Sequence, residues 1–369
     1  MRELYIKPAI HEFDDFKSFA QEFALSEKDL ILTNEYIYNP IIAEVNPPCR
    51  KLFQEKYGAG EPDDKMAQAL MDEVRAMDCD RIIAVGGGTV IDLAKILVLS
   101  GSDDIYDLLD NADKMTKGKQ LVVIPTTCGT GSEATNISIL NLSRYGTKKG
   151  LVLDTICADS AVLIPEFLKS LPYYVFAMSS IDALIHATEG YLSPRASYLS
   201  DMFAERAIRD IIKGYKDIAE KGQDTRFENG KLFLHASTCG GVAISNPGGG
   251  IVHGMSYALG GKYHVAHGES NYVFFTNILR MYREKAPDGK MKQLEKLIAE
   301  AFPGQDALDA LDGLLNAVYP KKGMRDFGAT REDIAAFAKS TMDNQQRLLK
   351  GSYTTLTEED ILLLFEQSY

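Results

Sequence analysis

Cysteine is scarce in this chain, and its pattern excludes two common kinds of site. The five cysteines are an odd number, widely scattered and without a C-x-x-C pair. Neither a disulfide framework nor a zinc–thiolate centre is therefore indicated. We expect reduced thiols, and we expect Cys128, which lies within a loop motif, to be a small buried hydrophobe.

Positive charge and long apolar runs are also lacking. Lys and Arg number 40 against 52 Asp and Glu, which gives a net charge of −12. That charge repels a phosphate backbone, and the short basic clusters indicate solvated loops. No run in the sequence approaches the roughly 18 apolar residues that span a bilayer, and the charged start Met1–Lys7 does not resemble a signal peptide. We expect a cytoplasmic protein with neither a nucleic-acid nor a membrane partner.

The length of 369 residues favours two domains, because a domain averages roughly 150 residues. Apolar runs at Asp29–Thr33, Arg81–Val85 and Leu121–Ile124 alternate with amphipathic segments, which predicts a parallel sheet with flanking helices. After Pro172 such runs vanish. Helical periodicity follows in residues 198–220, 228–246, 270–286, 288–301 and 331–349, and a capping-box-like pattern at Thr357–Asp360 begins a last helix. We expect an α/β dinucleotide-binding domain over 1–171 and an all-helical metal-binding, catalytic domain over 172–369.

Two glycine-containing loops follow strands of the expected sheet. In Gly86-Gly87-Gly88-Thr89-Val-Ile-Asp92-Leu-Ala-Lys95, backbone N–H groups and the helix dipole can hold a pyrophosphate. The spacing is not G-x-G-x-x-G, so a plain strand-to-helix turn, with Thr89 as N-cap and Asp92 at the third helical position, is the alternative. The second loop is Pro125-Thr126-Thr127-Cys128-Gly129-Thr130-Gly131-Ser132-Glu133. It lies at the carboxyl end of its strand, where it could line a cofactor cleft or be an ordinary polar loop.

Two short stretches hold side chains that bind a divalent metal without sulfur. Asp182 and His186 are spaced i, i+4 and therefore share one face of a helix. His253 lies on a later helix that Leu259–Gly261 is expected to end, so that His267 arrives from the following loop. Any one of these histidines alone would indicate a structural residue. Together the four side chains predict an open metal site suited to Fe(II), Zn or Mn.

A metal beside a dinucleotide suggests a division of labour. The cation is a Lewis acid that lowers the pKa of an alcohol, and the adjacent carbon then releases hydride to nicotinamide. No separate protein base has to contact the alcohol. We expect this chemistry in the cleft between the two domains.

At these motifs the chain resembles the iron-containing (group III) alcohol dehydrogenases. The resemblance rests on Gly86–Lys95, Pro125–Glu133, Asp182–Tyr191, Gly250–Met255 and His267–Gly268, and it extends nearly end to end. It implies a dehydroquinate synthase-like architecture, NAD and Fe(2+) as cofactors with zinc as an alternative metal, and a homodimer. It also implies these roles: Asp182, His186, His253 and His267 as metal ligands; Gly87, Gly88 and Thr89 on the pyrophosphate; Thr126, Thr127 and Thr130 along the cofactor cleft; and Lys149, with Lys148 as an alternative, on a cofactor ribose.

Two positions depart from the pattern of that family. Many members have an acidic residue after the first strand to bind the adenosine ribose, where this chain has Asn34, so NAD is the expectation and NADP stays open. Tyr257 stands four residues after His253, where a number of relatives carry a histidine near the nicotinamide. Tyr257 and His264 are therefore candidates for proton relay or substrate contact, with simple packing as the alternative.

Within the family, the compact length and the stretch Gly261–His267 look most like the 4-hydroxybutyrate dehydrogenase branch. That resemblance implies interconversion of 4-hydroxybutyrate and succinate semialdehyde. The far carboxylate then needs a cationic or donor-rich contact, for which Lys262, His264 and Tyr257 are candidates. A diol or short-chain alcohol dehydrogenase of the same fold is the runner-up. A dehydroquinate-synthase-like lyase and a non-catalytic metal- and nucleotide-binding protein are alternatives of other classes.

Overall fold

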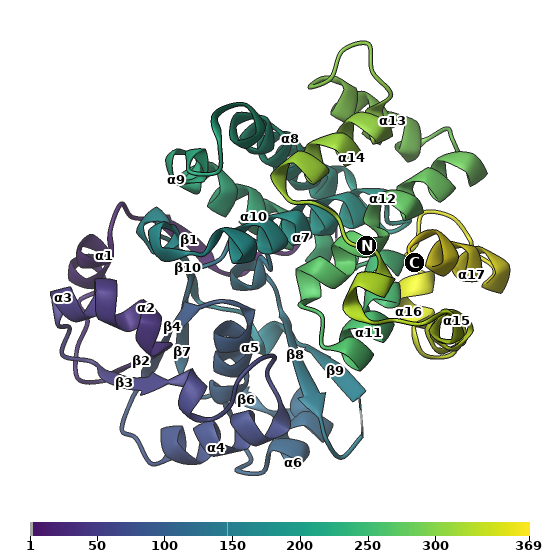
Figure 1. Cartoon of the computed structure of the whole chain (residues 1–369). Helices are drawn as coiled ribbons and strands as arrows, with labels where there is room; N and C mark the ends of the chain where they lie inside the picture. Colours follow the sequence, from purple (N-terminus) through teal and green to yellow (C-terminus); the bar gives the residue numbers. More distant parts are fainter. Residues whose placement is uncertain (1–2, 146) are drawn as a thin grey trace. The chain divides into compact units, whose positions relative to one another are not determined.

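The computed structural model describes residues 3–145 and 147–369, and the chain forms two compact units (Figure 1). The α/β unit comprises residues 6–127 and 131–171. The helical unit comprises residues 172–369 together with two short earlier segments, residues 3–5 and 128–130. Each unit has its own architecture.

The α/β unit is built on a parallel six-stranded sheet with the strand order β1-β10-β7-β4-β2-β3. Its strands are β1 (Ala9–Glu12), β2 (Asp29–Thr33), β3 (Arg50–Phe53), β4 (Arg81–Gly86), β7 (Gln120–Pro125) and β10 (Ser160–Leu163). Two short antiparallel pairs accompany it, β5 (Leu99–Ser100) with β6 (Thr116–Lys117) and β8 (Ile137–Leu142) with β9 (Thr147–Val152). Its α-helices are α1 (Phe16–Glu22), α2 (Glu35–Ile37), α3 (Ala43–Val45), α4 (Asp64–Arg75), α5 (Gly88–Leu97) and α6 (Ile105–Asp110).

Both faces of this sheet are buried, because successive side chains of a strand point to opposite sides. Leu30 and Leu32 of β2 lie in a core shared with α4, α5 and α6. Their neighbour Ile31 lies in the other core, with Phe16 and Phe19 of α1. Burial on both faces explains why the central strands are continuous apolar runs rather than alternating ones. The carboxyl ends of the parallel strands meet at one edge, which places the two glycine-containing loops on the same side.

The helical unit is built from packed α-helices. They are α7 (Tyr173–Leu192), α8 (Tyr198–Lys221), α9 (Thr225–Glu228), α10 (Gly230–Ser245), α11 (Ile251–Tyr263), α12 (His267–Lys285), α13 (Lys290–Ala299), α14 (Ala307–Val318), α15 (Arg331–Asn344), α16 (Gln346–Leu349) and α17 (Glu358–Gln367). In α7, 16 of 20 residues are buried, so every polar side chain within it needs a partner. This helix packs against α8, α10 and α12.

Sequence and structure agree on the sheet and on the helical second half, and they differ at three helix boundaries. The expected capping box of the last helix is present, with Asp360 accepting from the backbone and hydroxyl of Thr357. The expectation that Leu259–Gly261 ends the helix of His253 is wrong. Helix α11 continues to Tyr263 and ends at His264, which adopts the left-handed conformation with φ 54°. The expectation that His267 comes from a loop is also wrong, because α12 begins at this residue. Thr89 is likewise not an N-cap, because α5 begins at Gly88.

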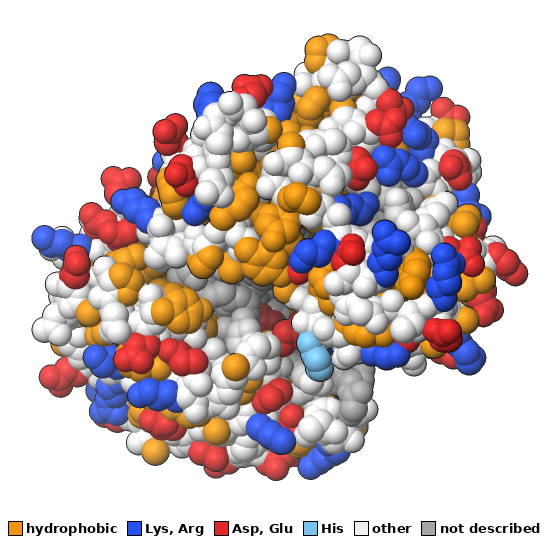
Figure 2. All heavy atoms as spheres, viewed as in Figure 1, with side chains coloured by type: hydrophobic (Ala, Val, Ile, Leu, Met, Phe, Trp, Pro, Cys, Tyr) orange, Lys and Arg blue, Asp and Glu red, His pale blue; other side chains and the backbone are white. Residues whose placement is uncertain are grey.

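Charge is mixed over the surface. Figure 2 shows acidic and basic side chains interspersed over the visible face. The net negative charge is thus not gathered into one patch on that face. Within the described ranges, the helices are too short or too polar to cross a membrane.

Candidate metal centre

The buried helix α7 carries the first two predicted ligands. Asp182 and His186 lie one turn apart on the same face of α7, and both are buried. The His186 Nε2 atom lies 3.7 Å from Asp182 Oδ2. Because a buried carboxylate is costly without partners, Asp182 depends on the groups gathered around it.

The two other ligands come from α11 and α12. His253 lies in the first turn of α11, and His267 is the first residue of α12. The close approach of α12 to α7 depends on Gly268, where an added Cβ atom would lie 2.2 Å from the Met178 carbonyl oxygen. A larger residue there would force the two helices apart, so Gly268 sets the position of His267 beside Asp182.

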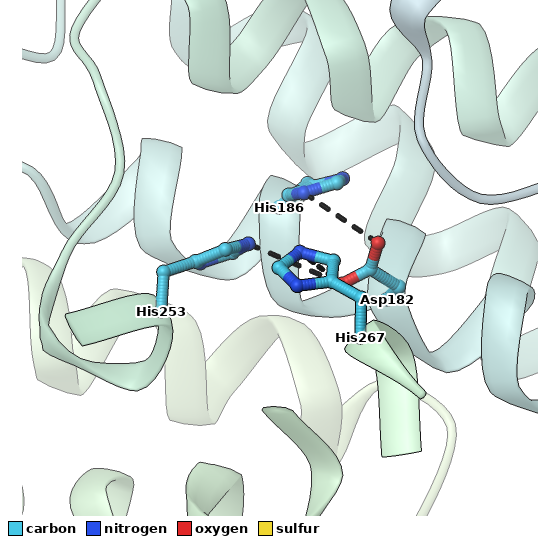
Figure 3. A group of neighbouring side chains, drawn as sticks. All are labelled: Asp182, His186, His253 and His267. Carbon is cyan, nitrogen blue, oxygen red and sulfur yellow. Dashed lines mark ion pairs between the residues drawn. The ribbon is translucent and has the colours of Figure 1, made fainter. Parts of the chain in front are cut away.

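Donor atoms of Asp182, His186, His253 and His267 lie within 4.8 Å of one another. The Nε2 atoms of His253 and His267 are 4.0 and 3.9 Å from Asp182 Oδ1. In Figure 3 the three imidazole rings gather around the carboxylate. Two donors that each lie about 2.1 Å from a shared cation are roughly 3–4 Å apart, so the cluster has the dimensions of a metal site.

Hydrogen bonds on the outer side of two rings fix which nitrogen faces the cluster. The Nδ1 atom of His253 lies 2.6 Å from Glu189 Oε2, and that of His186 lies 3.3 Å from the Gly129 carbonyl oxygen. An ionised carboxylate and a carbonyl only accept hydrogen bonds. Each Nδ1 therefore carries the proton, and each Nε2 presents a lone pair.

The Nε2 atom of His253 is buried and has no hydrogen-bond partner among the described residues. A buried polar atom in that state is rare in a folded protein. Its lone pair shares one small volume with the donor atoms of Asp182, His186 and His267. A divalent cation would satisfy all four, and the residues therefore fit such an ion.

The buried carboxylate of Glu189 is close to three hydrogen-bond donors. Besides His253 it accepts from the backbone N–H groups of Gly250 at 3.0 Å and Val252 at 2.7 Å. It thereby ties α7 to the start of α11 and orients the His253 ring at the same time. Sequence reasoning missed this residue, although its place three residues after His186 on the same helix face was a signal.

Asn271 is a second contact that sequence reasoning missed. Its Nδ2 atom donates to Asp182 Oδ1 at 2.7 Å and lies 3.2 Å from His267 Nε2. Burial alone raises the pKa of Asp182, but the three neighbouring imidazoles and the Asn271 amide outweigh burial and hold that pKa below its ordinary value. The carboxylate is therefore ionised and available as a ligand.

The other candidate side chains for catalysis or substrate binding have different surroundings. Tyr257 stacks on His267, with ring centroids 6.4 Å apart and planes 27° apart. His264 is exposed and forms the end of α11. Lys262, a candidate for the substrate carboxylate, donates to the carboxylate of Asp333. Its charge is therefore already engaged.

In the α/β unit the glycine-rich turn has the predicted place between β4 and α5. An added Cβ atom at Gly86 would lie 2.6 Å from Val90 Cβ, so packing alone requires that glycine. At Gly87 the nearest atom would be 3.5 Å away, which is ordinary contact. Packing does not impose a glycine at position 87, where a ligand could approach the backbone. Gly88 is the first residue of α5, and Thr89 Oγ1 donates to a backbone carbonyl.

Asp92 belongs to a buried network rather than to the surface of the turn. It accepts from Ser132 Oγ and from the Ile139 backbone, each at 2.9 Å. The same Ser132 hydroxyl accepts from the fully buried Lys95 at 2.7 Å, and burial lowers the pKa of Lys95 to about 8. The network joins α5 to Ser132 of the second glycine-containing loop and to Ile139 of β8.

The remaining predicted cofactor contacts are spread over separate segments. Thr126 is buried, and Thr127 and Thr130 are partly buried. Lys149 lies on β9, half exposed and 3.5 Å from an Asp110 carboxylate oxygen. Its alternative, Lys148, pairs with a different carboxylate. The cofactor roles of these residues stay predictions.

Cys128 is fully buried, and burial raises its thiol pKa to about 12. Its Sγ atom lies 3.8 Å from the Ser179 hydroxyl. A thiol in this environment is unreactive, as the sequence interpretation expected.

Asn34 at the end of β2 has an acidic neighbour that the sequence did not reveal. Its Nδ2 atom donates to Glu55 Oε2 at 2.8 Å and to Gln54 Oε1 at 3.2 Å. Glu55 follows β3, so its exposed carboxylate lies at the edge of the sheet where the strands end. A carboxylate is thus present beside position 34 after all.

A parallel α/β sheet with a glycine-rich turn, and a buried cluster of one aspartate and three histidines, are together features of a metal-dependent oxidoreductase. Family comparison matches residues 10–165 to "Iron-containing alcohol dehydrogenase" and residues 176–369 to "Fe-containing alcohol dehydrogenase family, C-terminal". The chain belongs to the iron-containing alcohol dehydrogenase family, and it is an oxidoreductase that interconverts an alcohol and its aldehyde. The family, fold class and enzyme class expected from the sequence are confirmed.

Similarity to known proteins extends over the whole chain. It is 45% identical over 371 residues to 4-hydroxybutyrate dehydrogenase from Clostridium kluyveri, covering 100% of both chains. It is 33% identical to long-chain-alcohol dehydrogenase 1 from Geobacillus thermodenitrificans, covering 89% of this chain and 86% of that one. Among solved structures, sulfoacetaldehyde reductase from Bifidobacterium kashiwanohense in complex with NAD+ matches with a TM-score of 0.86 at 21% identity, covering 100% of this chain and 98% of that one. The last match supports the fold alone.

Proposed function

We propose that this protein interconverts 4-hydroxybutyrate and succinate semialdehyde, with NAD as the hydride carrier and Fe(2+) held by Asp182, His186, His253 and His267. The observation that carries the substrate assignment is the 45% identity to 4-hydroxybutyrate dehydrogenase over the full length of both chains. The buried cluster with the unpartnered His253 Nε2 atom supports the metal assignment.

The cation would supply Lewis-acid chemistry, which favours the deprotonated form of an alcohol near neutral pH. The protein groups prepare the site for it. The Glu189 carboxylate and the Gly129 carbonyl hold the ring protons of His253 and His186 on Nδ1, away from the cluster. Asn271 holds one oxygen of Asp182. The Tyr257 ring, which stacks on His267, is our candidate for excluding water from that ring or contacting the substrate.

The α/β unit is the proposed nucleotide-binding domain, over 1–171, and the helical unit is the proposed metal-binding domain, over 172–369. The Glu55 carboxylate beside Asn34 supports NAD over NADP, because a carboxylate there can accept from ribose hydroxyls and repels a 2′-phosphate. Replacing Glu55 by Gln should raise the ratio of NADP to NAD activity by about tenfold, a loss of roughly 1.4 kcal/mol of discrimination. An unchanged ratio would remove Glu55 from the argument.

The substrate assignment is tested with a panel of alcohols. Protein purified anaerobically and loaded with Fe(2+) is assayed with 4-hydroxybutyrate, 1-butanol and 1,2-propanediol, each with NAD and NADP. We expect kcat/KM to be highest for 4-hydroxybutyrate with NAD. Preference for an uncharged alcohol would refute the substrate assignment and leave the family assignment standing. Metal analysis of the same preparation decides between iron and zinc.

A homodimer in the cytoplasm completes the proposal. The family resemblance supports the homodimer. All five cysteines are free thiols, which fits the reducing conditions of that compartment. Light scattering of the purified protein would test the oligomeric state.

A further inference from the structure

The proposed substrate presents a recognition problem that the metal ligands do not solve. A carboxylate lies at the far end of 4-hydroxybutyrate from its hydroxyl group. With bonds of about 1.5 Å, the extended chain places the two groups only about 5–6 Å apart. The residue that binds the carboxylate must therefore lie on an element that carries a metal ligand or on one adjacent to it.

Two cations near the ligands are already paired with buried carboxylates. Lys262 donates to Asp333. The Nζ atom of Lys322 lies 2.9 Å from the Oε1 atom of Glu269, and Glu269 stands two residues after His267. Binding a substrate carboxylate would require either lysine to give up its present partner. A cation without a partner is the better candidate.

The short helix α16 packs against the part of α11 that carries His253. An added Cβ atom at Gly254, the residue after this ligand, would lie 3.5 Å from both Gln345 Cβ and Leu348 Cβ. The backbones of Gly249 and Gly351 also approach closely, since an added Cβ at Gly351 would lie 2.2 Å from the Gly249 carbonyl oxygen. Contacts at both ends thus hold α16 beside the first turn of α11.

Arg347 lies on α16 between Gln345 and Leu348. Its side chain is exposed, and its guanidinium forms no ion pair or side-chain hydrogen bond with the residues that the structure describes. Because Gln345 and Leu348 on either side of it contact Gly254, Arg347 lies on an element that packs beside the turn of α11 that carries His253. Its guanidinium donors are available to a substrate.

We propose that Arg347 binds the carboxylate of the substrate and thereby selects a short ω-hydroxy acid over an uncharged alcohol. An arginine suits this role because its planar fork of N–H donors matches a carboxylate, with two parallel hydrogen bonds. This inference rests on the proposed function, since it names the residue that recognises the proposed substrate.

Steady-state kinetics of variants at position 347 test the role. For Arg347→Ala we expect KM for 4-hydroxybutyrate to rise about 10- to 100-fold, the usual effect of losing a hydrogen-bonded charge pair. The kinetic constants for 1-butanol should stay close to those of the wild type. Arg347→Lys should recover part of the loss, and Arg347→Glu should shift preference toward 4-amino-1-butanol. Calorimetry with butyrate, which has no hydroxyl group to oxidise, should show weaker binding to Arg347→Ala.

Lys350→Ala is the matched control, because Lys350 is also an exposed cation and follows the same short helix. Equal effects of the two alanine substitutions would assign the result to general electrostatics and overturn the proposal. Equal losses with 4-hydroxybutyrate and 1-butanol in Arg347→Ala would overturn it as well, since a carboxylate anchor cannot affect an uncharged alcohol. Failure of the proposed function looks different. In that case the wild-type protein itself would prefer uncharged alcohols.

Discussion

Replacing Glu189 by glutamine tests the structural basis of the metal site most directly. The carboxylate accepts from Gly250, Val252 and the His253 ring, at 3.0, 2.7 and 2.6 Å. An amide of nearly the same shape has one oxygen acceptor and an NH2 group that only donates. It cannot satisfy all three donors. If the NH2 group faces His253 Nδ1, the ring must move its proton to Nε2, the atom that faces the other ligands.

We expect the exchange to weaken metal binding more than it weakens the fold. Loss of an outer-shell partner of a metal-bound histidine typically lowers metal affinity about 10- to 100-fold, which corresponds to about 1.4–2.7 kcal/mol. The unmet backbone donor adds a cost of about 1–3 kcal/mol to folding. Titration of the metal-free variant with Co(2+), followed by the visible absorption of the bound ion, gives affinity and coordination geometry together. Urea unfolding gives the change in stability.

Glu269→Gln provides the matched control for this experiment. Glu269 is also a buried glutamate of the helical unit, but its partners are Tyr174 and Lys322 rather than a metal ligand. We expect that substitution to reduce stability and to leave Co(2+) affinity nearly unchanged. The assigned role of Glu189 would be refuted if Glu189→Gln bound Co(2+) with the affinity and spectrum of the wild type.

Three further predictions concern the metal, the helix packing and the pH. A chelator should lower the melting temperature of the Fe(2+)-loaded protein, since a ligand at about 100 times its Kd stabilises the fold by about 2.7 kcal/mol. An unchanged melting temperature would count against a metal in the isolated protein. Gly268→Ala, which brings a Cβ atom to 2.2 Å from a backbone oxygen, should cost about 1–3 kcal/mol in urea unfolding. Gly261→Ala, with nothing within 4 Å, should be neutral or stabilising, and equal losses would contradict the packing argument. Hydrogen bonds from Lys262 and Tyr263 hold the pKa of Asp333 below its ordinary value of 3.8. The stabilisation that these bonds give the fold is therefore complete above pH 3.8 and is lost as the pH falls below it. Asp333→Asn should flatten the acid limb of a stability–pH curve, and an unaltered limb would contradict this.

Much of the fold could be predicted from hydrophobic pattern, because that pattern reports burial directly. The run Asp29–Thr33 is β2 with the predicted bounds, since a strand buried on both faces has to be continuously apolar. The end of α11 could not be predicted in this way. Glycine can end a helix but does not have to. Gly260 and Gly261 lie within α11, which ends only where His264 adopts a positive φ.

The metal ligands could be predicted from residue type and spacing, whereas the long-range contacts of their partners could not, although the place of Glu189 on the helix face of His186 was a signal. Asp182 and His186 share a helix face by simple periodicity. The partners of Glu189 include backbone N–H groups of a segment more than sixty residues away, and no sequence pattern encodes such a contact. The carboxylate of Glu55 beside Asn34 was missed for the same reason, because it is contributed by the turn that follows the neighbouring strand rather than by the next residue in the chain.

The segment Cys128–Thr130 has a consequence for how this protein can be divided. It leaves the sheet of the first half, yet it folds with the helices of the second half and supplies the carbonyl that orients His186. A gene fragment starting at residue 172 would encode all four ligands and still lack that carbonyl. In such a fragment the His186 ring would be mispositioned, so the helical half cannot be transferred by itself. A chimera of two relatives should take Cys128–Thr130 from the same parent as the helical half.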